Sequence, residues 1–374
     1  MVRTLNPGVL EKAGWGSPVS VKLTTDQVNY LNVGLMFFSA AAAFVYPFEL
    51  FLLVYAVLGP LHYLTEISWL HDKQYYTRRK HDYLFLTAAG AVITLIFLGV
   101  LKGLPGTAVE FLIYMAFAAG LVFLLLSDIF IRSAGLLAAA IAGLIMLKFP
   151  FFGPLFGLFF PTLVHVYVFT GLFLFAGLLK GRSLSGLLSL LMFGAVAASF
   201  IFIHPAHSHY HPGDYVRDNY GFLNANGAGS SVFISLNFFI LRAFGLHDFG
   251  QPTLPFSDYI GGINDFLYQD PVALSLMSFI AFAYTYHYLN WFSKTSIIRW
   301  HEISRARMFS VGFIWIASLV LYAWNYVLGF KWLFFLSFAH VLLEFPLNHL
   351  TLINIGKELL KLSTWEKKNP ARVS

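Results

Sequence analysis

Long unbroken apolar runs constrain this chain more than any other feature of its sequence. A helix needs about 20 apolar residues to cross the hydrocarbon core of a bilayer, and several runs reach that length. The strands of an outer-membrane β-barrel would instead alternate apolar and polar residues over segments of about ten. The runs exclude a water-soluble globular enzyme and predict an all-α protein, a polytopic transmembrane helical bundle.

Charged residues are scarce in this chain, whereas histidine is abundant. Of 374 residues, 58% are hydrophobic and 11% are charged, and there are 13 histidines and no cysteine. A soluble domain has about 25% charged residues. The lack of cysteine excludes a disulfide-built domain and a thiolate metal site. Apart from methionine sulfur, only nitrogen and oxygen side chains remain to hold a metal ion.

The apolar windows predict about ten membrane spans. Their ranges are 27–46, 48–70, 83–101, 107–127, 134–149, 155–179, 185–203, 271–292, 308–328 and 331–352. Lys and Arg gather in the segments 73–80, 180–182, 294–307 and 357–372. The positive-inside rule places these segments in the cytoplasm, which requires both termini to be cytoplasmic. We therefore expect a multi-pass protein of the bacterial inner (cytoplasmic) membrane. The net charge of +6 is then explained by basic segments beside the membrane lipids, and it does not indicate that the protein binds nucleic acid.

The spans divide the chain into five parts. These are an N-terminal surface tail (1–26), a seven-span part (27–203), a long external segment (204–270), a three-span part (271–352) and a basic cytoplasmic tail (353–374). Residues 231–245 are apolar, but an eleventh span there would move 294–307 outside. We therefore expect an interfacial or re-entrant helix at 231–245. The external segment is long enough to dock a membrane-protein partner.

Two spans carry the same pattern of ionisable residues. The second span contains His62-x-x-x-Glu66, and the tenth contains His340-x-x-x-Glu344. Residues four apart lie on one face of a helix, so each pair points together. A further His follows each Glu by five residues: His71 and His349. On an ideal helix these two are rotated away, so they are weaker members of the pattern. Ionisable groups inside a membrane cost a few kcal/mol and usually mark function.

Two more spans add a buried histidine each, His165 and His287. At a rise of about 1.5 Å per residue, these groups and the two His/Glu pairs can share one layer in the cytoplasmic half of the bundle. His62, His165, His287 and His340 are the candidate metal ligands, and the two Glu are candidate ligands or catalytic orienting groups. Imidazole and carboxylate donors suit non-haem iron, with zinc, manganese or copper as alternatives. Hydrogen-bonded helix contacts or a bis-His b-haem are the other interpretations.

A second histidine cluster lies in the external segment. It comprises His204, His207, His209 and His211. This spacing in a loop can chelate a metal ion, which makes it a candidate second metal cluster. The alternative is a polar, pH-sensitive loop. In the predicted orientation, the cluster is on the side of the membrane opposite to the His62 layer.

Two short motifs resemble a known family. The segment PLHYLTE at 60–66 resembles the intramembrane His-Gly-x-x-Asp motif of bacterial β-carotene-cleaving dioxygenases of the Brp/Blh type, because a carboxylate follows the His by four residues. The segment YHYLNW at 286–291 resembles the late His-containing helix of that family. Tyr63 replaces the family's Gly, and Ala283 replaces the first His of its His-x-x-x-His. The resemblance implies a helical membrane protein with His-ligated non-haem iron that splits β-carotene to retinal with O₂.

Three hypotheses of function follow from the sequence. The first is a membrane non-haem metal oxygenase, with iron, that uses O₂ on a lipid-soluble small molecule such as a carotenoid or another isoprenoid or lipid. The second is a proton- or ion-coupled transporter in which the His/Glu pairs form a relay. The third is a non-catalytic subunit of a larger membrane complex that docks through 204–270.

Overall fold

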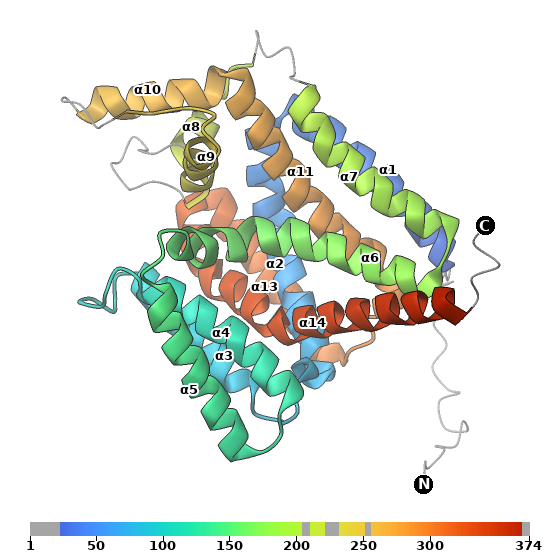
Figure 1. The fold of residues 1–374 in the computed structure, drawn as a ribbon. Coiled ribbons are helices and arrows are strands. Elements are labelled where there is room, and N and C mark those ends of the chain that lie inside the picture. The colour runs from blue at the N-terminus through green and yellow to red at the C-terminus, as the bar shows by residue number, and fades with distance from the viewer. Residues whose placement is uncertain (1–22, 204–209, 221–231, 251–255, 369–374) are drawn as a thin grey trace.

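The computed structural model describes residues 23–203, 210–220, 232–250 and 256–368. Every regular element within these residues is a helix, so the predicted all-α bundle is confirmed (Figure 1). Nine helical segments in them are long and apolar enough to cross a membrane, which makes the chain a multi-pass membrane-type protein. They are α1 (Thr25–Val45), α2 (Pro47–Asp72), α4 (Ala108–Leu125), α5 (Ile129–Met146), the continuous pair η2 (Pro154–Phe169) and α6 (Thr170–Gly181), α7 (Leu184–Phe202), α11 (Pro271–Ser293), α13 (Arg305–Trp324) and α14 (Tyr326–Lys368).

The remaining helices are short. They are η1 (Gln74–Tyr76), α3 (Tyr83–Phe97), α8 (Asp214–Tyr220), α9 (Val232–Ala243), α10 (Phe256–Gln269) and α12 (Thr295–Ile298). The predicted span 83–101 corresponds to α3, which has 15 residues and ends just before Gly99, whose φ of 70° is incompatible with a right-handed helix. A helix of that length covers only about 22 Å of a hydrocarbon core about 30 Å thick.

The predicted helix at 231–245 corresponds to α9, and one predicted boundary, the start of the basic tail, differs from the helices observed. The 12 residues of α9 are also too few to cross a membrane, while its interfacial or re-entrant position stays a prediction. The predicted basic tail 353–374 begins as a continuation of α14, which runs to Lys368. The N-terminal tail 1–26 lies almost wholly outside the described residues, and the orientation of the bundle stays a prediction.

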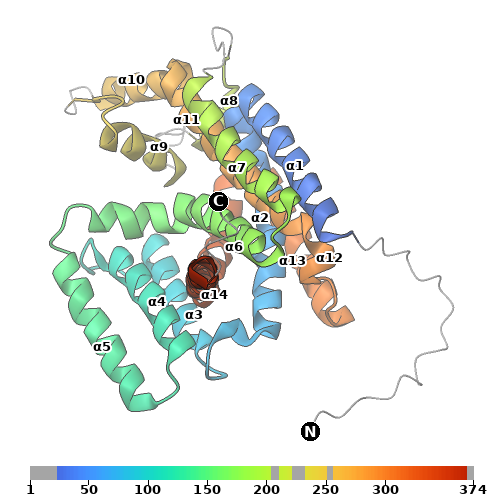
Figure 2. The same ribbon diagram turned by 45° about the vertical axis from the view of Figure 1, so that its right-hand side comes forward.

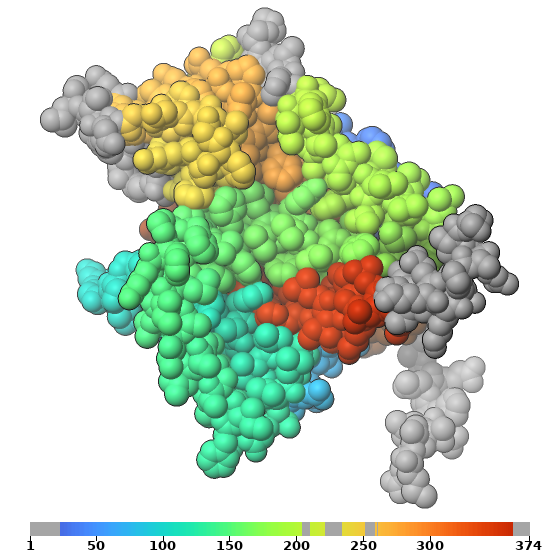
Figure 3. All heavy atoms as spheres, viewed as in Figure 1, coloured from blue at the N-terminus to red at the C-terminus, as the bar shows by residue number. Residues whose placement is uncertain are grey.

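Helices α2 and α11 form the centre of the bundle. In the most apolar stretch of each, 67% and 78% of the residues are buried, against 11% for α5 and 17% for α13. Both α2 and α1 pack along α11, and α7 lies beside α1 (Figure 2). On the other side of the centre, α14 packs against α2, α3 and α4, and it reaches the surface beside α6 (Figure 3). Side chains on α2, α11 and the middle of α14 are therefore shielded from the bilayer.

The buried side chains form two apolar cores that meet near the middle of α14. The first contains Tyr63 and Tyr288, from α2 and α11. The second contains Ala339 and Val341, from α14. The ionisable residues identified in the sequence lie next to these positions in the chain. The candidate site is therefore at the boundary between the two cores.

The helix that carries His165 is irregular. Residues 154–169 form a π-helix, and Thr162 inside it has non-helical backbone angles of φ −117° and ψ −106°. Pro161 explains the distortion, because it has no N–H to donate and its ring clashes with the carbonyl one turn back. The Thr162 hydroxyl donates to the Leu158 carbonyl. Such π segments are frequent at functional sites, and this one turns His165 toward α14.

We predict that the contact between α4 and α14 does not tolerate a methyl group. A Cβ added at Gly120 would lie 3.0 Å from Phe345 Cβ and 3.2 Å from the Pro346 nitrogen. Gly120→Ala should therefore lower the stability by about 1–3 kcal/mol. The matched control is Gly34→Ala, where nothing lies within 4 Å and alanine should be neutral or stabilising by up to about 1 kcal/mol. Thermal unfolding in detergent compares them, and equal stability of the two variants contradicts the close packing.

Candidate metal centre

Four histidines from four helices meet in the centre of the bundle. They are His62 of α2, His165 of η2, His287 of α11 and His340 of α14, with exposed fractions of 1%, 2%, 8% and 3%. The Nε2 atoms of His62 and His287 are 3.0 Å apart, and those of His165 and His340 are 3.1 Å apart. The centroids of the His62 and His340 rings are separated by 5.4 Å, so the two pairs form one cluster.

The far nitrogens of two of these rings are held by neighbouring groups. Thr170 Oγ1 lies 2.9 Å from His287 Nδ1, and the same hydroxyl donates to the Val166 carbonyl at 2.9 Å. Because that hydroxyl has only one proton, it accepts from His287 Nδ1–H. The Nδ1 of His340 lies 3.3 Å from the Leu336 carbonyl, which can only accept. Both rings are therefore protonated at Nδ1, and the Nε2 lone pair points into the cluster, as in metal-binding histidines.

The two carboxylates occupy different places in the cluster. Glu66 Oε2 lies 3.0 Å from His62 Nε2, beside the nitrogen that faces the other histidines. Glu344 Oε2 lies 3.0 Å from His165 Nδ1, the nitrogen on the outer side of that ring. The sequence pattern pairs Glu344 with His340, but in the structure this carboxylate contacts His165. Glu66 is therefore placed to face the centre, and Glu344 is placed to orient a ring.

The donor atoms are arranged as in a metal site. One nitrogen each from His62, His165 and His340 lies within 4.8 Å of the others. Two ligand nitrogens at right angles about a metal, each about 2.1 Å from it, are about 3.0 Å apart, which matches the two Nε2–Nε2 distances. The donors are imidazole and carboxylate, which suit first-row transition metals. This buried cluster can therefore hold a metal ion.

Aromatic side chains enclose the cluster. The Tyr63 ring stacks on His340, with centroids 4.3 Å apart, and its hydroxyl lies 2.8 Å from that of Tyr288. The Trp291 ring packs edge-on against His62 at 5.5 Å, and its N–H donates to Thr65 Oγ1 at 3.0 Å. These contacts fix the rings of the two histidines and keep bulk water away from them.

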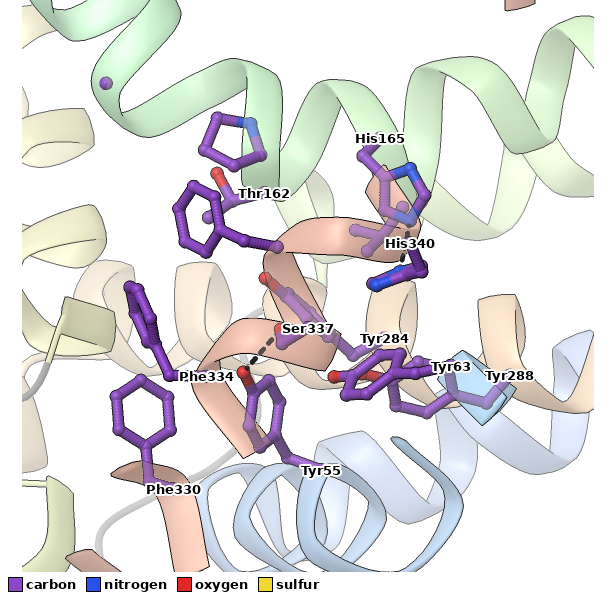
Figure 4. A pocket seen from close by; sticks show the side chains of 14 residues that line it. Tyr55, Tyr63, Thr162, His165, Tyr284, Tyr288, Phe330, Phe334, Ser337 and His340 are labelled. Carbon is purple, nitrogen blue, oxygen red and sulfur yellow. Dashed lines mark hydrogen bonds between the residues drawn. The ribbon is translucent and has the colours of Figure 1, made fainter. Parts of the chain in front are cut away.

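Two cavities reach the cluster from different directions. One, of about 50 Å³, begins at His165 and His340 and has an aromatic wall (Figure 4). The rest of its wall includes Tyr55, Tyr284, Tyr288, Phe330, Phe334 and Ser337. The other, of about 220 Å³, begins at His62 and His287 and is lined by both carboxylates. We call them the aromatic cavity and the polar cavity. Charged side chains line only the second cavity, whereas tyrosine, serine and threonine hydroxyls are the polar groups of the first, apart from its two histidines.

Several histidines singled out in the sequence lie away from the cluster. His71 is exposed, with its Nδ1 3.5 Å from the Tyr75 hydroxyl. His349 is buried, and its Nε2 donates to the Phe117 carbonyl at 2.8 Å, a contact between α14 and α4. In the external group, His204, His207 and His209 lie outside the described residues, and His211 is exposed. That second cluster stays a prediction.

Two polar residues near the cluster are not among the candidates identified from the sequence, although their spacing points to them. Asn290 and Lys294 line the polar cavity together with His287. The three residues have the spacing i, i+3 and i+7, which places them on one face of a helix. Thr170 follows His165 by five residues, and nothing in the sequence marks it as the partner of His287, because the two are brought together by tertiary packing.

Comparison with family models, with curated proteins and with solved structures finds no match for this chain. The similarity of 60–66 and 286–291 to Brp/Blh-type dioxygenases stays a prediction from those motifs.

We predict that Thr170 supports metal binding through His287. Thr170→Val removes the hydroxyl that holds His287 Nδ1 with little change of shape, and metal affinity should fall about 10–100-fold. Thr94→Val is the matched control, because Thr94 also donates to a carbonyl of its own helix, at 2.8 Å from Gly90 O, and has no site contact. Competition titrations with Co²⁺ on purified protein measure both variants. Equal affinities would show that the Thr170 contact does not orient a ligand.

Proposed function

We propose that this chain is an integral-membrane non-haem iron oxygenase that acts on a lipid-soluble substrate. The observation that carries the proposal is a cluster of four buried histidines and a carboxylate, with converging nitrogens, at the end of an aromatic cavity. Burying ionisable groups inside a membrane protein costs free energy, and such groups usually mark a functional site. The similarity to Brp/Blh-type dioxygenases favours iron among the metals that imidazole binds.

The chain's residues divide the work in this proposal. The iron would be held by His62, His165, His287 and His340. Glu66 would be a further ligand, because its carboxylate lies beside His62 Nε2, and Glu344 would orient the His165 ring. The bound iron supplies the electron chemistry that lets O₂ react with an otherwise inert hydrocarbon. The Tyr63–Tyr288 pair and the rings around it exclude water and place hydroxyl groups beside the cluster.

The lining of the aromatic cavity, and not its present volume of about 50 Å³, favours an extended substrate with little charge. Along α14 it is lined by Phe330, Phe334, Ser337 and His340, which share one helix face. At about 1.5 Å per residue, this face extends about 15 Å from the cluster. No Asp, Glu, Lys or Arg is among the cavity's lining residues. A carotenoid or another isoprenoid entering from the bilayer is the substrate class that this lining favours.

Two alternatives agree less well with the geometry. A proton- or ion-coupled transporter needs ionisable relay groups on both sides of its midpoint, and apart from the two histidines the aromatic cavity is lined by hydroxyl groups without a carboxylate. A non-catalytic subunit predicts that the histidines can be replaced without consequence.

The proposal predicts one iron per chain and its loss when a cluster histidine is removed. His62→Ala and His340→Ala should each reduce bound iron by more than about tenfold, because each removes one ligand nitrogen and the neighbouring aromatic and aliphatic side chains cannot replace it. His71→Ala is the control, since this exposed residue belongs to the same sequence pattern but lies outside the cluster. Elemental analysis of purified protein gives the metal content of each variant.

Oxygen consumption separates an oxygenase from a metal-binding protein of another class. Iron-loaded wild-type protein and His71→Ala should consume O₂ when a carotenoid is supplied in detergent micelles, and His62→Ala should not. Iron-free wild-type protein, or equal metal content in all variants, contradicts the metal centre. Full iron occupancy without O₂ consumption on carotenoid and other isoprenoid substrates contradicts the oxygenase.

A further inference from the structure

The polar cavity has charged and amide side chains in its wall, which the aromatic cavity lacks. Its wall contains Glu66 and Glu344, and Asn290 and Lys294 from the last turns of α11 and just beyond. Seven residues separate His287 from Lys294, which corresponds to about 10 Å along the helix axis. The cavity therefore leads from the cluster toward the membrane surface where α2 and α11 both end, which is the cytoplasmic surface in the predicted orientation.

Three buried polar atoms of residues lining this cavity have no hydrogen-bond partner within the described part of the chain. They are His62 Nδ1, Trp69 Nε1 and Asn290 Oδ1. Asn290 is only 7% exposed. Buried polar groups are nearly always hydrogen-bonded, and leaving one unpaired costs about 1–3 kcal/mol. Two unpaired nitrogens and one unpaired oxygen on residues that line a space of about 220 Å³ favour a polar occupant.

Lys294 gives this cavity a positive charge at its outer end. The residue is half-buried, and its ammonium group makes no ion pair or hydrogen bond with any residue that the structure describes. Burial lowers the pKa of Lys294 to about 8, so the side chain is mostly cationic at neutral pH. A cation at the outer end of a partly desolvated passage attracts small anions to that end, while Glu66 and Glu344 lie at the inner end beside the histidines.

We propose that the polar cavity is a second binding site and entry route, through which water and small inorganic anions reach the metal centre separately from the apolar substrate. Lys294 attracts the anion, and Asn290 and Trp69 supply hydrogen bonds along the way. The inference rests on the proposed metal centre, but not on the identity of the organic substrate. It assigns the two cavities to two classes of ligand on opposite sides of the histidine cluster.

Azide binding to the cobalt-loaded protein tests this route without turnover. Cobalt(II) gives a visible spectrum that changes when azide coordinates, so the spectrum also reports that the centre is intact. In Lys294→Met the apparent Kd for azide should rise about tenfold, because one attractive charge is lost from a low-dielectric passage. Binding of nitric oxide, a neutral probe, to the iron(II) protein should change little in the same variant.

Two control variants separate the route from general effects. Lys331→Met makes the same charge change at an exposed position near the start of α14, and azide affinity should equal that of the wild type. Ser337→Leu narrows the aromatic cavity and should also leave azide affinity unchanged. Cobalt binding with equal azide affinity in Lys294→Met and wild type overturns the inference. So does a loss of azide affinity in Ser337→Leu or Lys331→Met as large as that in Lys294→Met. Failure of the wild-type protein to bind cobalt overturns the metal centre itself.

Discussion

The structure depends on polar side chains that gather in one place where water is scarce. Four imidazole rings and two carboxylates lie in a bundle whose other central side chains are mostly apolar. Each of these groups would be costly to bury alone, and together they supply donors and acceptors to one another at about 3 Å. Their helices come from distant parts of the chain, so this polar cluster fixes how α2, η2, α11 and α14 approach. A metal ion would replace the shared protons as the group that holds the nitrogens together.

Three of these four helices carry an internal proline near the cluster. Pro60 precedes His62 by two residues, Pro161 precedes His165 by four, and Pro346 follows Glu344 by two. Each proline removes one helical hydrogen bond and bends the local path. Membrane helices tolerate this when neighbouring groups satisfy the freed carbonyls, and next to Pro161 the Thr162 hydroxyl donates to the Leu158 carbonyl of the same distorted segment. Irregular helices therefore let the functional side chains meet where straight helices would hold them apart.

Much of the fold and part of the candidate site were predictable from the sequence, because both depend on local periodicity. Apolar runs identified the long helices, and the spacing of four residues identified His62 with Glu66 and His340 with Glu344. The partner of Glu344 was not predictable, because the choice of His165 over His340 depends on how η2 is turned. For the same reason Thr170 was missed. Asn290 and Lys294 share a face with His287 and could have been found from spacing alone. The early end of α3 was not predictable from the apolar run, because it coincides with the left-handed backbone conformation of Gly99.

The central claim is that the histidine cluster binds iron through nitrogen and oxygen atoms alone. X-ray absorption at the iron edge of the purified protein tests this directly, because the first shell distinguishes sulfur from nitrogen or oxygen and the outer-shell scattering counts imidazole rings. The account predicts a nitrogen/oxygen shell at about 2.1 Å with the outer-shell signature of three or four histidines. A protein without bound metal, or an iron spectrum lacking the imidazole signature, would contradict it.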